Sequence, residues 1–134
     1  MREYKFRGKR IDNGEWVYGY YFIEERDIED GIIWQDIPKI QQRYGDHFQY
    51  FDVDPDTVGQ YTGWNDKNGK EIYEGDLVQV LDYTSWEGLY KVVWDEESLM
   101  YVLVDAYGDK EKMCEFEHYL VRGNIYENPE LLKC

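Results

Sequence analysis

The sequence predicts a mainly β protein, and three observations support this. Aromatic residues make up 18% of the 134 residues, with 14 tyrosines and 5 tryptophans, and aromatic residues favour strands. Ala106 is the only alanine, which is a poor composition for helices because alanine is the best helix former. Short apolar runs alternate with turns rich in Gly, Asn and Asp, a pattern typical of a small barrel or sandwich.

The N-terminal part predicts a β-hairpin region. In "YKFRGKRIDNGEWVYGYYFIEE", Asn13 and Gly14 form a strong turn signal because both residue types tolerate positive φ. A second turn is expected at Asp30-Gly31, followed by a short strand from Ile32 to Ile37. The next stretch, residues 41–59, has no clear pattern, but Pro55 marks a bend. We therefore expect a boundary between residues 1–56 and residues 57–134, which could still fold as one compact unit.

The most patterned stretch is "QYTGWNDKNGKEIYEGDLVQV", residues 60–80. Asn68-Gly69 predicts a hairpin turn between strands at 58–63 and 70–73. Glu74-Gly75-Asp76 predicts a second bend, at which Asp76 accepts backbone hydrogen bonds. The residues predicted to build turns are Asn13, Gly14, Gly63, Asn68, Gly69, Glu74, Gly75 and Asp76.

The remaining C-terminal sequence continues in the same way. Strands are expected at 77–81, in "YKVVWD", in "LMYVLVDAY" and around 119–126, whereas "YGDKEKM" reads as a loop. Asn128-Pro129 begins a short terminal turn or helix.

The sequence predicts no catalytic, cofactor or metal site. Ser85 and Ser98 are the only serines, and neither lies in the G-x-S-x-G pattern of a hydrolase. His118 follows Cys114 by four residues, but a zinc site usually needs a second pair of ligands. The runs "DVDPD" and "NDKNGKE" lack the glycine and glutamate spacing of a calcium loop. They are explained as a solvated loop and a hairpin tip, so we expect a protein that is not an enzyme.

The charge balance argues against direct nucleic-acid binding. Asp and Glu outnumber Lys and Arg, 29 to 15, for a net charge of −14, and such a field repels phosphates. The opening "MREYKFRGKR" is basic, which suits a solvated strand face, self-association or an anionic ligand. The two cysteines form no CxxC pair, and there is no apolar run of membrane-spanning length and no signal peptide. These features predict a cytoplasmic protein.

The tryptophans divide into two groups. Most strand tryptophans pack in cores, and single-strand binding platforms also need a positive groove. Trp64 and Trp86 fall in or near predicted loops. We therefore expect these two to form an exposed contact surface.

Three long stretches carry a resemblance: "YKFRGKRIDNGEWVYGYYF", "TVGQYTGWNDKNGKEIYEGDLV" and "GNIYENPELL". They are similar to the YopX-like family of bacteriophage and prophage proteins. The resemblance is weakest between Tyr83 and Lys112. It implies a small phage-encoded β protein with an SH3-like barrel in its C-terminal part and a host-cytoplasmic location. It implies no activity and no catalytic residues.

Three functional hypotheses follow. The first is a non-catalytic protein-interaction module with an unknown protein partner or with further copies of itself. The alternative is an acidic decoy that mimics nucleic acid and inhibits a host DNA-binding or DNA-processing protein. An enzyme that uses clustered carboxylates and a divalent metal has the least support, because no ligand spacing stands out.

Overall fold

The computed structural model describes residues 5–28, 33–81, 89–113 and 118–132, with side chains described up to residue 24 and again from residue 36. The chain forms two compact units, Met1–Gln60 and Tyr61–Cys134. The described residues form strands and short 3-10 helices, with no α-helix among them. The predicted mainly β class is therefore confirmed.

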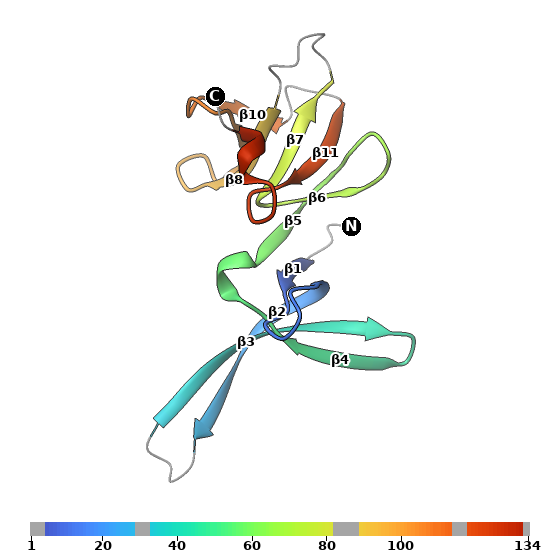
Figure 1. Cartoon of the computed structure of the whole chain (residues 1–134), viewed down its shortest axis with the longest axis vertical. Helices are drawn as coiled ribbons and strands as arrows, with labels where there is room; N and C mark the ends of the chain where they lie inside the picture. Colours follow the sequence, from blue (N-terminus) through green and yellow to red (C-terminus); the bar gives the residue numbers. More distant parts are fainter. Residues whose placement is uncertain (1–4, 29–32, 82–88, 114–117, 133–134) are drawn as a thin grey trace. The chain divides into compact units, whose positions relative to one another are not determined.

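The first unit is built on one antiparallel sheet with the strand order β4-β3-β2-β1-β5 (Figure 1). Its elements are β1 (Phe6–Lys9), β2 (Trp16–Ile28), β3 (Ile33–Tyr44), β4 (His47–Asp52), η1 (Pro55–Thr57) and the start of β5 (Gly59–Asn65). The β1–β2 hairpin forms as expected. The turn predicted at Asp30-Gly31 lies outside the described residues.

β3 is twice as long as the strand that the sequence predicted. It pairs with β2 along residues 33–41 and with β4 along residues 39–44, so the two ladders overlap at residues 39–41 (Figure 1). The β3–β4 hairpin turns at Gly45, whose φ is 57°. The expectation of a strand ending at Ile37 was wrong. Proline usually interrupts strands, but β3 continues through Pro38 to Tyr44. Pro38 is nevertheless tolerated inside the strand, where its carbonyl accepts a hydrogen bond from the Val53 N–H at 3.0 Å.

One face of this sheet carries the core of the first unit. Val17, Ile40 and Val53 are buried. Four partly buried residues pack against them: Phe6, Tyr21, Phe51 and Val58. The predicted boundary between residues 56 and 57 falls within η1.

The second unit contains a five-stranded antiparallel sheet with the order β10-β9-β8-β7-β11. Its elements are β6 (Glu71–Tyr73), β7 (Asp76–Val80), β8 (Leu89–Asp95), β9 (Met100–Val104), β10 (Lys110–Lys112), β11 (Tyr119–Asn124) and η3 (Pro129–Leu132). β6 pairs with β5. The stretch expected to be a loop around residues 107–113 contains the short edge strand β10.

The described strands of the second unit form an open sheet. β10 and β11 are its two edges, and among the described residues no ladder joins them into a closed barrel. The expected closed barrel is therefore not found among these strands. They form an antiparallel sheet with one core.

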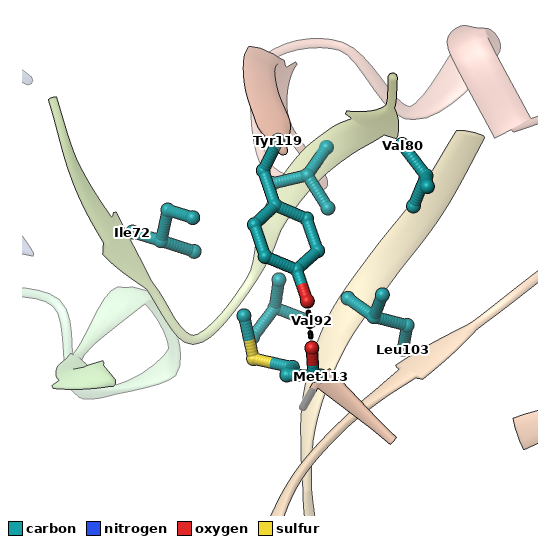
Figure 2. Packing of buried hydrophobic residues seen from close by; sticks show 7 residues of the cluster. Ile72, Val80, Val92, Leu103, Met113 and Tyr119 are labelled. Atoms are coloured by element: carbon teal, nitrogen blue, oxygen red, sulfur yellow. Dashed lines mark hydrogen bonds between the residues drawn. The ribbon is translucent and has the colours of Figure 1, made fainter. Parts of the chain in front are cut away.

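That core lies among β6 to β11. Ile72, Val78, Val80, Val92, Leu103, Met113 and Tyr119 are buried together. Figure 2 shows the Tyr119 ring in the middle of this cluster, with its hydroxyl donating a hydrogen bond to the backbone carbonyl of Met113. The hydrogen bond satisfies the one polar atom that a buried tyrosine brings into an apolar core.

Candidate functional site

The most patterned stretch of the sequence forms a hairpin tip organised by Asp66. This side chain is 8% exposed. Its Oδ1 accepts hydrogen bonds from the N–H groups of Asn68 and Lys70 at 2.8 and 2.9 Å, and its Oδ2 accepts from the Val121 N–H at 3.1 Å. Burial alone raises the pKa of Asp66, but these backbone donors outweigh it and hold the pKa below its usual value.

The bend at Glu74-Gly75-Asp76 is also held by a buried aspartate that accepts a hydrogen bond from the backbone. Oδ2 of Asp76, a residue 1% exposed, accepts a hydrogen bond from the Tyr73 N–H at 2.8 Å. Gly75 has φ 92°, its N–H donates to the Val92 carbonyl, and its carbonyl accepts from the Ile125 N–H, both at 2.9 Å. A Cβ at Gly75 would lie 3.0 Å from the Tyr126 ring. Only glycine suits both this φ and this close approach.

The two C-terminal motif stretches, residues 57–78 and 123–132, therefore meet in the second unit. β11 pairs with β7, with Asn124 opposite Asp76. Oδ1 of Asn124 accepts from the N–H groups of Tyr126 and Glu127, both at 2.9 Å. We call this assembly, residues 66–76 and 119–128, the corner joint. The side chains of Asp66, Asp76 and Asn124 accept hydrogen bonds from backbone groups, which is a structural role and needs no substrate.

The other predicted turn residues are placed as follows. Oδ1 of Asn13 accepts from the Glu15 N–H at 2.9 Å, and Gly14 has φ 74°. Gly63 has φ 89° and lies where the β5–β6 register shifts. Gly69, with φ 82°, closes the Asn68-Gly69 turn, where its N–H donates to the Asp66 carbonyl at 2.9 Å.

The two predicted contact tryptophans fare differently. Trp64 lies in β5 rather than in a loop and is 39% exposed. Its ring packs edge-on against Tyr119, with centroids 6.2 Å apart. Trp64 therefore covers the second core as well as facing solvent. Trp86 lies outside the described residues.

Conventional binding chemistry is sparse in the described part of the chain. No group of three or more His, Cys, Asp or Glu side chains there is arranged so that it could hold a metal ion. A hollow of about 460 Å³ is lined by Lys9, Arg10, Ile11, Gly14, Asp54 and Pro55. The Arg10 guanidinium in this hollow already has partners. It forms an ion pair with Asp12 at 2.6 Å and lies over the Phe51 ring at 4.5 Å. This pairing raises the pKa of Arg10 and lowers that of Asp12.

The largest unexpected feature is an exposed aromatic face in the first unit. It consists of Tyr20, Phe22, Phe48 and Tyr50, which are 62%, 37%, 50% and 55% exposed. Tyr20 and Tyr50 both lie opposite Gln41, and residues opposite one another in an antiparallel sheet share a face. The rings of Phe22 and Tyr50 pack edge-on with centroids 6.0 Å apart. The core of this unit lies on the other face, which bears Tyr21, Ile40 and Phe51.

The cations Lys39 and Arg43 lie on this face. Arg43 is opposite Phe48, and its Nε donates a hydrogen bond to the Gly45 carbonyl at 2.9 Å. The charge of Lys39 is compensated. Nζ of Lys39 contacts Glu24 at 2.9 Å and Asp52 at 3.2 Å, across three strands. The hydrogen bond to Glu24 is the largest reason that the pKa of Lys39 is raised; burial opposes it and Asp52 adds to it. The charges of Lys39, Glu24 and Asp52 within the exposed aromatic face are thus paired with one another.

Sequence reasoning missed this face, although a signal was present. Tyr20 and Phe22 alternate along one strand, and Phe48 and Tyr50 alternate along another. The first pair lies in a run that is apolar or aromatic at nearly every position, so its alternation does not mark one exposed face, and the second pair lies in the stretch with no clear pattern.

Comparisons with known proteins agree with this fold. The crystal structure of protein EF1440 from Enterococcus faecalis is similar, with a TM-score of 0.52 and 24% sequence identity over 99% of this chain and 100% of that chain. At that identity the likeness concerns the fold alone. No curated protein matches the chain. The family described as YopX protein matches residues 5–133. The chain therefore belongs to the YopX protein family.

Proposed function

We propose that the chain is a non-catalytic protein-interaction module, and that it docks the apolar surface of another protein on the exposed aromatic face. The observation that carries this proposal is the group of four rings on one sheet face, opposite the core. Exposed apolar patches of this kind mark interaction sites more often than isolated exposed residues do.

The chemistry of the face favours a protein partner over nucleic acid. Base-stacking sites combine aromatic rings with a positive groove. Here the central cation, Lys39, is already paired with Glu24 and Asp52, and the whole chain has a net charge of −14. A partner that brings aliphatic or aromatic side chains meets no such electrostatic penalty.

The rings are also prepared for binding. Phe22 and Tyr50 pack on each other, and Nε2 of Gln41 donates a hydrogen bond to the Tyr50 hydroxyl at 3.2 Å. Rings that are held before binding lose little conformational entropy when a partner covers them. Aromatic residues of this type often dominate interface energies.

A capture experiment with the full chain tests the proposal. Tagged wild type, Tyr20→Ala and the matched control Tyr107→Ala would be incubated with extracts of bacterial hosts with and without induced phage. Tyr107 is 81% exposed and lies in the second unit. We expect a partner that wild type and Tyr107→Ala retain and Tyr20→Ala loses, and the purified partner should reproduce that pattern. Equal capture by both variants, or no reproducible partner, would overturn the proposal.

The acidic composition supports a second candidate function, the nucleic-acid-mimicking decoy. The excess of 29 acidic over 15 basic residues divides between the two units, with net charges of about −5 and −9. In the same experiment, a decoy captures a host DNA-binding protein that duplex DNA displaces and that Tyr20→Ala still retains.

Two finer expectations remain proposals. The assignment of the second unit to the SH3-like class is supported by five antiparallel strands around one core, and an experimental structure would test it. A bacterial cytoplasmic location can be tested by fractionation. In the described part of the chain there is no helix with the length and apolar character needed to cross a membrane.

A further inference from the structure

We infer that two copies of the chain pair edge to edge along β4, antiparallel about a twofold axis. This inference names a second copy as a partner and goes beyond the proposed function, because it concerns the strand edge and leaves the exposed aromatic face open.

The outer edge of β4 offers backbone groups for such pairing. β4 is the last strand in its sheet. In an antiparallel ladder, alternate residues point their N–H and C=O groups toward the neighbour and away from it. The Val53 N–H points to β3, where it bonds the Pro38 carbonyl, whereas the Asp52 carbonyl points outward, where it accepts from the Ile11 N–H at 3.0 Å. Counting back by two, Phe48 and Tyr50 also point outward.

This edge has little protection against pairing. Natural edge strands are commonly protected by lysine, proline or bulges. The edge strand β10 of the second unit follows that rule, since its sequence is KEK. β4 has the sequence HFQYFD, with no lysine or proline, and its ladder with β3 is regular from His47 to Asp52.

The local charge suits a partner that is itself strongly acidic. Between Lys39 and Asp52 there are two basic residues, Lys39 and Arg43, and two acidic residues, Asp46 and Asp52. Residues 39–52, where β3 and β4 pair, therefore have no net charge in a chain of net charge −14. Two copies repel each other least where such neutral hairpins meet.

The outward groups also select a register. A twofold axis at Gln49 places Phe48 opposite Tyr50 of the second copy, and their outward N–H and C=O groups then pair. This register puts aromatic rings next to each other across the new ladder. A twofold axis at Tyr50 instead requires the Asp52 carbonyl, which Ile11 already occupies. Of these two registers, only the one centred on Gln49 leaves the existing hydrogen bonds intact.

Such a pair joins the β4-edged sheets of the two copies into one and doubles the exposed aromatic face. A contact of a few residues per copy buries less than a standard interface. We therefore expect a weak dimer that forms in the micromolar range or above.

Amide exchange on the wild-type full chain tests the geometry directly. Hydrogen exchange measured by NMR at low and high protein concentration should show that the Phe48 and Tyr50 amides become protected as concentration rises. The Gln49 and Phe51 amides, which point to β3, should be protected at both concentrations. If the Phe48 and Tyr50 amides exchange at the same rate at all concentrations, the inference fails.

A pair of variants separates backbone pairing from ring contact. Phe48→Ala and Phe48→Pro both remove the ring, but only Phe48→Pro removes the outward N–H. In sedimentation velocity, we expect the wild type to dimerise, Phe48→Ala to dimerise about tenfold more weakly, and Phe48→Pro to stay monomeric.

Other outcomes of the sedimentation experiment contradict the inference. A monomeric wild type throughout the series overturns it, and so does equal dimerisation of the two variants. If Phe48→Pro does not fold, the exchange experiment on the wild type decides. A monomeric chain that still captures its partner through Tyr20 would sink this inference and leave the proposed function standing.

Discussion

Asp66 shows how one side chain can hold distant parts of the second unit together. It accepts hydrogen bonds from Asn68 and Lys70 in its own turn and from Val121, which is 55 residues away in the chain. A carboxylate suits this place because it can only accept, and the three backbone groups that bond to it are all donors.

Asp66→Asn should therefore destabilise the protein. An amide in this position must turn either its oxygen or its NH2 group toward each donor, so at least one N–H loses its acceptor. We expect a loss of about 2 kcal/mol in the free energy of unfolding, measured by urea denaturation. Glu96→Gln, at an exposed position in the β8–β9 turn, removes a charge in the same unit and should change stability little. Equal effects of the two variants would contradict this account.

The same carboxylate predicts a dependence of stability on pH. The pKa of Asp66 is lowered in the folded state, so the unfolded chain takes up its proton first as the pH falls. The stabilisation is complete above the unfolded pKa of about 3.9 and is lost as the pH falls through the folded value. Urea midpoints measured over an acid pH series should show a smaller loss for Asp66→Asn than for the wild type. Parallel curves would rule out this role.

Two glycines of the corner joint allow the cost of backbone strain to be measured separately from the cost of a steric clash. Gly69 and Gly75 both have positive φ, but a Cβ at Gly69 has no atom within 4 Å, whereas one at Gly75 lies 3.0 Å from Tyr126. We expect Gly69→Ala to cost about 1 kcal/mol from strain alone, and Gly75→Ala to cost more. Thermal unfolding of the two variants provides the comparison, and a larger loss for Gly69→Ala would contradict it.

At the scale of strands, β2 changes partner at Gly19. Phe6 of β1 lies opposite Gly19, and the next residue, Tyr20, lies opposite Gln41 of β3. A Cβ at Gly19 would come within 1.9 Å of the Gln41 carbonyl oxygen. β2 and β3 can approach each other this closely only because residue 19 has no side chain.

Gly19→Ala should therefore separate strands rather than only strain a turn. The contact is with backbone, which cannot move aside as a flexible side chain can, so we expect a loss of about 3 kcal/mol or more. Gly8→Ala is the control, because its Cβ would meet only side chains, at 3.2 Å, and should cost less. Chemical denaturation monitored by tryptophan fluorescence would measure both. Similar losses at the two sites would remove the argument.

The elements that could be predicted from the sequence are those whose signal lies within a few neighbouring residues. Asn13-Gly14 and Asn68-Gly69 are turn signals complete within a few residues, so both hairpins could be predicted. The reach of Asp66 to Val121 could not, because one sequence does not show which distant strands pair. The β3–β4 hairpin was missed because Pro38 argues against a strand and because its exposed aromatic rings leave no alternation of buried and polar residues.

At the scale of the whole molecule, the net charge of −14 gives the two functional candidates opposite dependences on salt. Contacts made by the exposed aromatic face are apolar and should hold or strengthen as salt rises. Added salt also screens repulsion between two acidic copies, with a Debye length of about 10 Å at 0.1 M, so the inferred dimer should tighten. A decoy that binds a basic protein through its carboxylates should instead weaken steeply with salt.

A salt series on the purified partner complex would therefore decide between the candidates. We expect its Kd to change by less than about threefold between low and physiological ionic strength, because paired charges such as Lys39 with Glu24 and Asp52 add little net field to the face. Tyr107→Ala should follow the wild type, whereas Tyr20→Ala should bind weakly at every salt concentration. A Kd that rises by orders of magnitude with salt and ignores Tyr20→Ala would replace the interaction module with the decoy.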